Sequence, residues 1–256
     1  GVRLVGSEMC IRDRRDRLLK WCKLSRNTLA LVLNAGDGLL LGEFLRQIPE
    51  ETLYALVDTS QEKQTLSAMF DNPSSGIKPK IAQDSSGNPE AFKILALVFE
   101  RIVGRNVLQK HQSKTAFLET LKPWISADGV FVFAETVPAL GQRLSELIPP
   151  EKLETKFLKL LKTAEEEIYH ATENARSNWT PDTLREELES ADWKVKRWQV
   201  KEFLTPSMLR TTQIEQWFAV QSVSPHSSYG QLLSANFSAD QLNNLEETFQ
   251  LSLIHI

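Results

Sequence analysis

The sequence predicts a doubly wound α/β fold, in which mostly parallel strands alternate with helices on both faces of one sheet. Three observations lead to this prediction. Residues 29–33 form an apolar run that stops at a glycine turn, after which apolar residues return at helical spacing. Further strand-like runs follow at intervals, separated by helical patterns or loops. The most apolar of them, residues 130–138 (VFVFAETVP), closes a series of five strands.

The first half of the chain contains the clearest strand and helix boundaries. Pro49 ends the helix that follows the glycine turn, and residues 52–58 (TLYALVD) form a strand that closes on an acidic residue. The loop 72–80 (NPSSGIKPK) separates the next helix from a short third strand. The expected elements are a helix over 15–24, a strand over 29–33, a helix ending near Pro49, a strand over 52–58, a helix over 61–70 and a strand over 80–84.

The second half continues the alternation and then becomes mainly helical. Thr180 and Pro181 suit the cap and the first position of a helix. Residues 193–203 (WKVKRWQVKEF) alternate strictly, which predicts a sixth strand with one polar face. Ser238 and Gln241 have the spacing of a capping box. The expected elements are a helix over 88–97, strands over 99–108 and 130–138, helices over 114–125, 151–174 and 180–192, a strand over 193–203, and helices near 206–218 and after 238.

The two ends of the chain are expected to be foreign to the domain. Residues 1–14, which end in SEMCIRDR, and residues 251–256 (LSLIHI) resemble translated sequencing adapter, familiar from assembled environmental reads. The sequence therefore predicts a single domain over residues 15–250, a fragment of a longer chain. A helical insertion at about 145–180 is expected between strands five and six, because residues 151–174 carry apolar side chains three and four positions apart.

Composition excludes several classes of protein. The formal net charge is −3 with both signs interspersed, so strong autonomous binding of nucleic acid is not expected. Cys10 and Cys22 form neither a disulfide framework nor a metal site, and the four histidines show no paired spacing. No apolar run is long enough for a membrane helix. The sequence predicts a cytoplasmic protein from a reducing compartment, with no metal and no membrane contact.

The turn at residues 34–38 (NAGDG) is the first candidate for a ligand site. A turn between a strand and a helix leaves backbone N–H groups unpaired, and these attract polar or anionic parts of a ligand. A dinucleotide-binding turn requires G-x-G-x-x-G, but Leu41 occupies the third glycine position. S-adenosylmethionine also needs small residues at such a turn, together with an acidic residue that ends the second strand. Asp58 lies at that place, although it would serve either cofactor.

Three segments distinguish between these cofactors by their order and spacing. They are residues 99–111 (FERIVGRNVLQKH), 117–136 (FLETLKPWISADGVFVFAET) and 184–195 (LREELESADWKV). They resemble strand four, the helix with strand five, and the helix before strand six of class I S-adenosylmethionine-dependent methyltransferases. The resemblance covers residues 27–220. It implies a Rossmann-like methyltransferase fold and S-adenosylmethionine as the cofactor.

A narrower resemblance rests on the short motifs GRNVL, AETVPALGQRL, EEEIY and NW. These are similar to the methyltransferase-like C-terminal domain of cyanobacterial fusions that carry a clamp-loader-like recombination ATPase. This resemblance implies a fused or associated ATPase domain as a partner. The segment itself contains no G-x-x-x-x-G-K-[ST] sequence, so no ATPase site is expected within it.

The methyltransferase resemblance implies a cofactor site at the first two strand ends. Asn34, Gly36 and Gly38 would contact the cofactor at the turn, and Asp58 would bind the ribose hydroxyls. Each residue also has a purely structural interpretation. The glycines suit a tight turn with positive φ, and Asp58 suits a solvated helix cap.

The resemblance extends the expected site to the third and fourth strand ends. Asp84, with Ser85 beside it, follows strand three, where the family's adenine-contacting acidic residue lies. The same two residues are typical of an ordinary loop. Arg105 and Asn106 would face the methionine end of the cofactor or the substrate. Arg105 is equally typical of a surface ion pair.

The chain departs from the family pattern at several positions. Asn34 stands where an acidic residue is usual, and asparagine can orient the turn but lacks the carboxylate. Leu40 replaces the last glycine of the turn and adds bulk where the helix starts. Glu100 replaces the usual aspartate of strand four, and Asp128-Gly129 replaces a common Gly-Gly.

No catalytic residue is predicted, because methyl transfer from an activated sulfonium depends mainly on positioning the nucleophile. A general base is needed only when the nucleophile must lose a proton. His111 is the nearest titratable candidate, and a surface histidine is the simpler interpretation. Glu135, which ends strand five, either lines the pocket or caps a turn. The methyl acceptor is unknown, and the 151–174 helix fits a substrate lid, a dimer face or ordinary packing.

Two functional hypotheses follow from the sequence. The first is an S-adenosylmethionine-dependent methyltransferase domain with an unidentified acceptor. The second is a noncatalytic Rossmann-like interaction or regulatory module attached to an AAA-type ATPase in DNA maintenance. A nicotinamide oxidoreductase is the third interpretation, and Leu41 argues against it because it would crowd the pyrophosphate turn.

Overall fold

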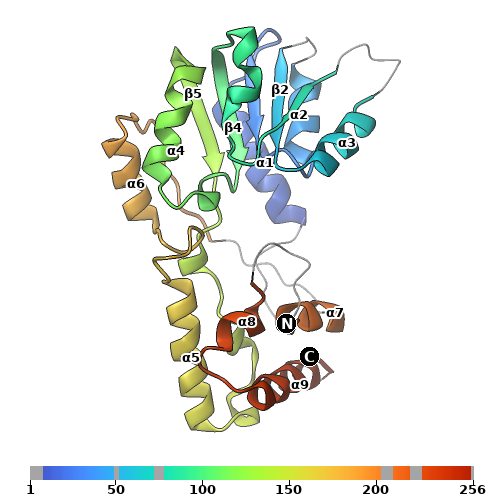
Figure 1. Ribbon diagram of the computed structural model, residues 1–256, viewed down its shortest axis with the longest axis vertical. Coiled ribbons are helices and arrows are strands. Elements are labelled where there is room, and N and C mark those ends of the chain that lie inside the picture. The colour runs from blue at the N-terminus through green and yellow to red at the C-terminus, as the bar shows by residue number, and fades with distance from the viewer. Residues whose placement is uncertain (1–7, 49–51, 72–77, 203–209, 220–226, 255–256) are drawn as a thin grey trace. The chain divides into compact units, whose positions relative to one another are not determined.

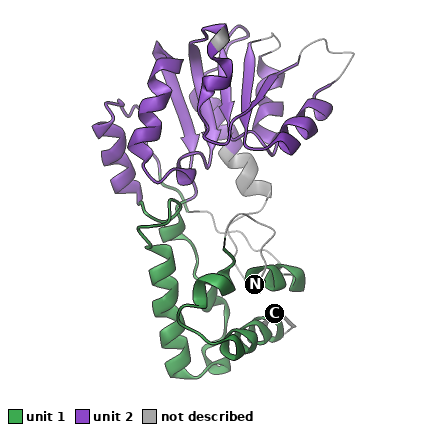
Figure 2. Cartoon of the chain, viewed as in Figure 1, with its two compact units in different colours: residues 1–10, 137–179, 200–256 green, residues 11–136, 180–199 purple. Residues whose placement is uncertain are grey.

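A computed structural model describes residues 8–48, 52–71, 78–202, 210–219 and 227–254 of the 256-residue chain. The structure divides into two compact units, which Figure 2 shows in different colours. The first, here called the sheet unit, comprises residues 11–136 and 180–199. The second, called the helical unit, comprises residues 1–10, 137–179 and 200–256. The single domain expected over residues 15–250 stays a prediction.

The sheet unit is built on five parallel strands in the order β3-β2-β1-β4-β5 (Figure 1). β1 lies between β2 and β4, and Val32 is in register with Ala55 on one side and Val103 on the other. The connections therefore run toward one side of the sheet from β1 to β3 and toward the other side from β4 to β5, as in a doubly wound sheet. The strands are β1 (Ala30–Leu33), β2 (Leu53–Val57), β3 (Lys80–Gln83), β4 (Phe99–Arg105) and β5 (Ile125–Ala134).

Helices connect the strands of this unit, and their caps follow the sequence. Thr59 and Glu62 form a capping box at the start of α3, and Ser113 caps α4. Thr180 caps α6 with Pro181 at its first position, as predicted. The helices are α1 (Glu8–Cys22), α2 (Leu39–Gln47), α3 (Ser60–Met69), α4 (Lys114–Leu121) and α6 (Pro181–Ser190), with 3-10 turns at Pro89–Leu95, Leu108–Lys110 and Lys122–Trp124.

The central strands are buried on both faces, so helices must cover both sides. On one face, Leu41 and Phe44 of α2 pack with Val32 of β1 in a single apolar cluster. On the other, Tyr54 of β2 meets Phe92 and Phe99 edge to face. Among other members, the first cluster also holds Leu18, Cys22, Ala30, Leu40, Leu53, Ala55, Val57, Leu66 and Val103.

A β-bulge at the start of β4 explains how Phe99 reaches the Tyr54 face. The backbone N–H groups of Glu100 and Arg101 both donate to the carbonyl of Leu29, at 2.9 and 3.2 Å. The Glu100 carboxylate accepts the N–H of Leu29 at 3.0 Å. Glu100 therefore ties β4 to β1 at the amino end of the sheet, away from the carboxyl ends of the strands.

The doubly wound α/β fold is confirmed, and the five predicted strands all occur, although β5 begins at Ile125, five residues before its expected start and at the end of the expected 114–125 helix. The prediction of a sixth strand over 193–203 is wrong for its described part, because residues 193–202 are not in a strand. Trp193 packs on Phe131 of β5 at 5.9 Å between ring centroids. Alternation predicts which side chains turn inward, but a strand also needs a hydrogen-bonded partner strand.

The helical unit has an apolar core of its own. Leu161 and Ala164 of α5 pack with Ile214, Leu233 and Leu245 of the later helices. Ser238 and Gln241 form the predicted capping box before α9. The helix expected near 206–218 is observed from residue 211, and residues 203–209 lie outside the described residues. The helices are α5 (Thr155–Tyr169), α7 (Thr211–Phe218), α8 (Tyr229–Leu233) and α9 (Ala239–Ile254), with 3-10 turns at Pro138–Leu140, Leu144–Leu147 and Pro150–Lys152.

A fully buried glutamate lies inside this core. Glu165 has no solvent exposure, and its carboxylate accepts the N–H of Ser145 at 3.0 Å and the hydroxyl of Tyr229 at 2.8 Å. Burial and the neighbouring Glu165 raise the pKa of the Tyr229 hydroxyl far above its ordinary value. Ser145 Oγ is itself buried and has no hydrogen-bond partner among the described residues.

The described helices also bear on the expected environment of the chain. None of them is long and apolar enough to cross a membrane.

Cys22 is fully buried where α1 meets the sheet, and its carbonyl accepts a hydrogen bond from Arg101 Nε at 2.6 Å. Burial raises the pKa of the Cys22 thiol to about 12, although the charge of Arg101 acts in the opposite direction.

Candidate functional site

The predicted site residues lie at one edge of the sheet, because the strands are parallel and each residue follows a strand end. Asn34 follows β1, Asp58 follows β2, Asp84 follows β3 and Arg105 ends β4. β1 and β4 are neighbours whose connections leave in opposite directions along the sheet. In open α/β sheets, the crevice at such a reversal is the usual ligand site.

The backbone of the turn after β1 matches the sequence expectation at Gly38 but not at Gly36, which does not adopt a positive φ. Asn34 adopts φ 51° and Gly38 adopts φ 68°, both in the left-handed region that asparagine and glycine tolerate best. Asp37 Oδ1 accepts the N–H of Leu39 at 3.1 Å. Leu39 is 53 % exposed, whereas Leu40 is buried in the core under α2. The Leu40 side chain therefore packs in the core and does not fill the turn.

Glu62, a residue that the sequence interpretation did not include, lies against the first glycine. Its carboxylate accepts the N–H groups of Asp58 and Thr59 at 2.9 and 3.0 Å and so caps α3. A Cβ atom at Gly36 would lie 2.4 Å from Glu62 Oε1, and one at Gly38 would lie 2.9 Å from Leu66. Gly38 therefore favours glycine through its positive φ and its contact with Leu66, whereas a Cβ at Gly36 would displace the end of the flexible Glu62 side chain. This structural role does not depend on a ligand.

Lys110 connects two of the predicted cofactor residues. Its ammonium donates to Asn34 Oδ1 at 2.6 Å and forms an ion pair with the Asp58 carboxylate. Both side chains of the ion pair keep about a third of their surface in water, 31 % for Lys110 and 32 % for Asp58. Asp58 is therefore not the helix cap of the structural interpretation, because Thr59 caps α3.

The exit of β4 is tied to the neighbouring strand ends. Asn34 Nδ2 donates to the carbonyl of Arg105 at 2.8 Å, and Arg105 forms an ion pair with Asp37. Asn106 adopts φ 53°, and its Oδ1 accepts the N–H of Thr136 at 3.0 Å. The amide of Asn34 thus links two strand ends, because it can both donate to the β4 exit and accept from Lys110.

The exit of β3 is satisfied locally. Asp84 Oδ1 accepts the N–H and the hydroxyl of Ser86, at 2.8 and 2.5 Å, in a short turn that continues to Gly87 at φ 69°. Ser85 is exposed. Asp84 and Ser85 therefore have the contacts of the ordinary loop that the sequence left open, and their role toward a cofactor stays a prediction.

Glu135 is the principal ionisable group at the end of β5. Its Oε1 accepts the N–H groups of Val107 and Leu108 at 2.7 and 3.0 Å, so it caps the turn after β4. Its Oε2 is buried and has no hydrogen-bond partner among the described residues. Burial raises the pKa of Glu135 to about 7, while the two N–H groups and Lys114 act in the opposite direction.

His111 and Lys114 lie beside this turn, where the His111 ring is partly buried and Lys114 is buried. The His111 ring stacks on Phe117 at 3.8 Å, and burial together with Lys110 and Lys114 lowers its pKa to about 4. Lys114 is 1 % exposed and donates to the carbonyl of His111 at 3.0 Å; burial lowers its pKa, while Glu187 and Glu135 act in the opposite direction. His111 therefore keeps part of its surface in water, as the simpler interpretation expects, and one face of its ring stacks on Phe117.

Sequence reasoning missed Glu62 and Lys110, which hold the site together. Glu62 acts locally within a capping box, whereas Lys110 acts on residues that are close to it only after the sheet has formed. The capping-box spacing of Thr59 and Glu62 was the available signal for one of them. For Lys110 the signal was only its position after a strand end.

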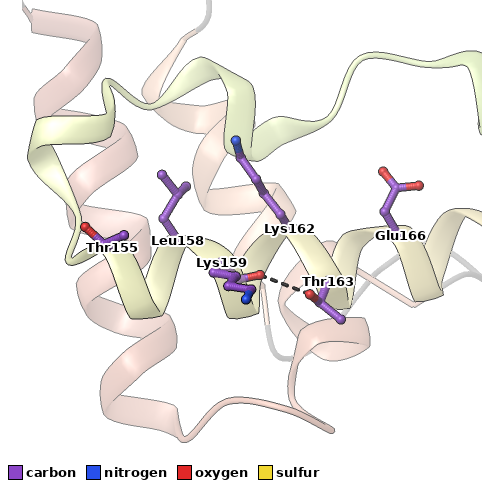
Figure 3. A pocket seen from close by; sticks show the side chains of 6 residues that line it. All are labelled: Thr155, Leu158, Lys159, Lys162, Thr163 and Glu166. Atoms are coloured by element: carbon purple, nitrogen blue, oxygen red, sulfur yellow. Dashed lines mark hydrogen bonds between the residues drawn. The ribbon is translucent and has the colours of Figure 1, made fainter.

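Metal binding and cavities add no further candidate at this edge. Among the described residues, no group of three or more histidine, cysteine or carboxylate side chains could hold a metal ion. A shallow groove lies on the surface of α5 in the helical unit, where Thr163 donates to the carbonyl of Lys159 at 3.1 Å (Figure 3). Its lining consists of Thr155, Leu158, Lys159, Lys162, Thr163 and Glu166.

Comparison with known proteins gives the fold. No protein-family model and no curated protein matches the sequence. The cyclopropane synthase MmaA2 of Mycobacterium tuberculosis is similar in structure, with a TM-score of 0.53, 14% identity, and coverage of 96% of this chain and 79% of that one. Mycolic acid cyclopropane synthase CmaA1 has a TM-score of 0.52 and 15% identity over 98% of this chain and 84% of that one.

The chain spans 62% of the length of a third protein, the precorrin-6y C5,15-methyltransferase of Geobacter metallireducens, over 51% of its own residues. At a TM-score of 0.39 and 14% identity, that likeness carries no weight here. The first two similarities agree with the strand order and confirm the Rossmann-like methyltransferase fold. At these identities a shared fold does not define an activity.

Proposed function

We propose that this chain is a methyltransferase domain that binds S-adenosylmethionine at the carboxyl ends of β1, β2 and β4. The observation that carries the proposal is the meeting of Asn34, Asp58 and Arg105 beside the reversal between β1 and β4. The resemblance of the sequence and the similarity of the fold to methyltransferases support the same proposal.

The residues present suit the cofactor. The Asp58 side chain keeps about a third of its surface in water, and its carboxylate can accept hydrogen bonds from a pair of ribose hydroxyls once Lys110 is displaced. Gly38 adopts a left-handed backbone just before α2 and has no side chain, so a ligand can approach the backbone there closely. Leu40 does not block this turn, because its side chain is in the core, and Leu39 is exposed to solvent beside it.

S-adenosylmethionine supplies an activated methyl group, so the protein's task is to hold the acceptor in line with the sulfonium. Asp58 and Asn34 would orient the nucleoside, and the β4 exit at Arg105 and Asn106 would border the acceptor. No side chain is assigned as a base. The acceptor stays unidentified.

Titration calorimetry with S-adenosylmethionine and S-adenosylhomocysteine tests the proposal. We expect micromolar to submillimolar binding of both ligands, and Asp58→Ala should weaken it tenfold or more, which corresponds to about 1.4 kcal/mol. Asp71→Ala is the matched control, because Asp71 is an exposed carboxylate that pairs with Lys78 just beyond the end of α3. Absence of heat with both ligands, from folded wild-type protein, would overturn the proposal.

The second candidate is a noncatalytic interaction or regulatory module attached to an ATPase in DNA maintenance. The observation that favours it is that polar groups at the strand ends bond to each other, with Glu62 against Gly36 and Lys110 on Asp58. Silent calorimetry would support this candidate. The gene sequence upstream of Arg15 tests the attachment, and an ATPase domain encoded there in frame would support it.

A further inference from the structure

We propose that Lys110 competes with the cofactor for Asp58 and Asn34, so that the cofactor binds as the lysine side chain leaves. This inference rests on the proposed function and concerns the regulation of the same site. Lys110 reaches both residues from the loop after β4, and its ammonium donates to Asn34 Oδ1 at 2.6 Å and pairs with Asp58. Those are the acceptor atoms that a nucleoside would need.

The loop that carries Lys110 is fixed at both of its ends. Asn34 Nδ2 donates to the Arg105 carbonyl at 2.8 Å, and Arg105 pairs with Asp37 at one end. Glu135 accepts the N–H groups of Val107 and Leu108 at the other. Hydrogen bonds thus hold the backbone of this loop to the ends of β1 and β5. From this backbone the Lys110 ammonium reaches Asp58 at the end of β2.

The Lys110 contact is nevertheless weak enough to be displaced. The side chains of Lys110 and Asp58 are 31 and 32 % exposed, and ion pairs with this much water contact contribute little free energy. Only the flexible side chain must move, because the backbone ties do not involve the ammonium. A ligand that brings two hydroxyl groups to Asp58 can therefore replace it without unfolding the loop.

Charge makes Lys110 a competitor of the cofactor. S-adenosylmethionine carries a positive sulfonium, and a nearby ammonium would repel it unless the lysine side chain moved away. The competition for Asp58, however, concerns the nucleoside that S-adenosylmethionine and S-adenosylhomocysteine share. Removal of the ammonium should therefore strengthen the binding of both ligands, including the one without a sulfonium.

Titration calorimetry on Lys110→Met tests this inference with wild type alongside. We expect about threefold tighter binding of both ligands, the size set by a partly exposed ion pair. Lys122→Met is the matched control, since Lys122 is 35 % exposed and pairs with Glu119 on α4. Raising the salt concentration from about 50 to about 500 mM should strengthen binding by wild type, by screening its ion pair, and leave the variant unchanged.

The outcomes separate the two proposals. If wild type binds and Lys110→Met binds equally or more weakly, Lys110 is no competitor, and the proposed function still stands. A gain confined to S-adenosylmethionine would also overturn the competition for Asp58, because it would reflect repulsion of the sulfonium alone. If neither protein binds either ligand while both remain folded, the proposed function fails and this inference fails with it.

Discussion

Two buried carboxylates, one in each unit, are satisfied in different ways. In the helical unit, Glu165 is fully buried, accepts the N–H of Ser145 and the hydroxyl of Tyr229, and leaves no carboxylate oxygen without a partner. In the sheet unit, Glu135 uses one oxygen to cap the turn after β4 and buries the other without a described partner.

The difference shows what a buried carboxylate contributes in each place. Full hydrogen bonding makes Glu165 a structural connector between α5, the 3-10 turn at Leu144–Leu147 and α8. Partial hydrogen bonding leaves Glu135 sensitive to protons, since burial raises its pKa to about 7. The sheet unit thus has a titrating group beside its candidate site.

Glu165→Ala should have the largest effect on stability. The change leaves the Ser145 N–H and the Tyr229 hydroxyl without their acceptor and opens a cavity beside Leu161, so we expect a loss of about 3 kcal/mol. Hydrogen exchange of the α5 amides measures this loss within the helical unit. Glu167→Ala on the exposed side of α5 is the control, and an equal effect there would remove the connector role of Glu165.

Glu135→Gln should have a smaller effect that depends on pH. Because the folded pKa is raised from 4.5 to about 7, its stabilising contribution is fully present below about pH 4.5 and is lost as pH rises through about 7. Wild type should therefore lose roughly 2 kcal/mol relative to the variant across this window. Denaturant unfolding of both proteins at several pH values measures the difference. Parallel curves would mean that Glu135 does not titrate there.

The depressed pKa of His111 acts with the opposite sign. Its pKa falls from 6.5 to about 4, so its contribution raises stability as pH increases between those values. His111 is present in wild type and in Glu135→Gln alike. The comparison of the two proteins therefore isolates the glutamate.

Ser145→Ala should have the smallest effect. Ser145 Oγ is buried without a described partner, so its removal relieves a desolvated hydroxyl and leaves the backbone bond to Glu165 intact. We expect a change between zero and a gain of about 0.5 kcal/mol, measured by the same hydrogen exchange of α5. A loss above about 1 kcal/mol would show that the Ser145 hydroxyl forms a hydrogen bond in solution. A water molecule would then have to bridge this hydroxyl, and the description of the Glu165 surroundings would have to include it.

The sequence predicted the fold well because its signals were local. The apolar run at residues 29–33, the glycine turn and the caps at Thr180 and Ser238 each depend on neighbours within a few positions. Residues 193–203 failed because alternation describes one chain, whereas a strand needs a second one alongside. Trp193 is accounted for by its packing on Phe131.

The sequence predicted where the candidate site lies in the fold, but not which side-chain contacts it contains. Parallel strands bring their carboxyl ends to one edge, so Asn34, Asp58 and Arg105 could be grouped from strand order alone. Glu135 caps a turn and Arg105 forms an ion pair, while their roles toward a ligand stay predictions. Lys110 was beyond reach, because it is 52 residues from Asp58 and a long side chain can point in many directions.

The buried thiol of Cys22 has a practical consequence. Shielded by α1 and protonated at neutral pH, it should resist alkylating reagents until that helix separates from the strands beneath it. In a chain with Cys10 replaced by serine, the speed of chemical labelling at Cys22 would report how often this part of the protein opens. Cys22 is therefore a natural probe of local opening, and no additional cysteine has to be introduced for labelling.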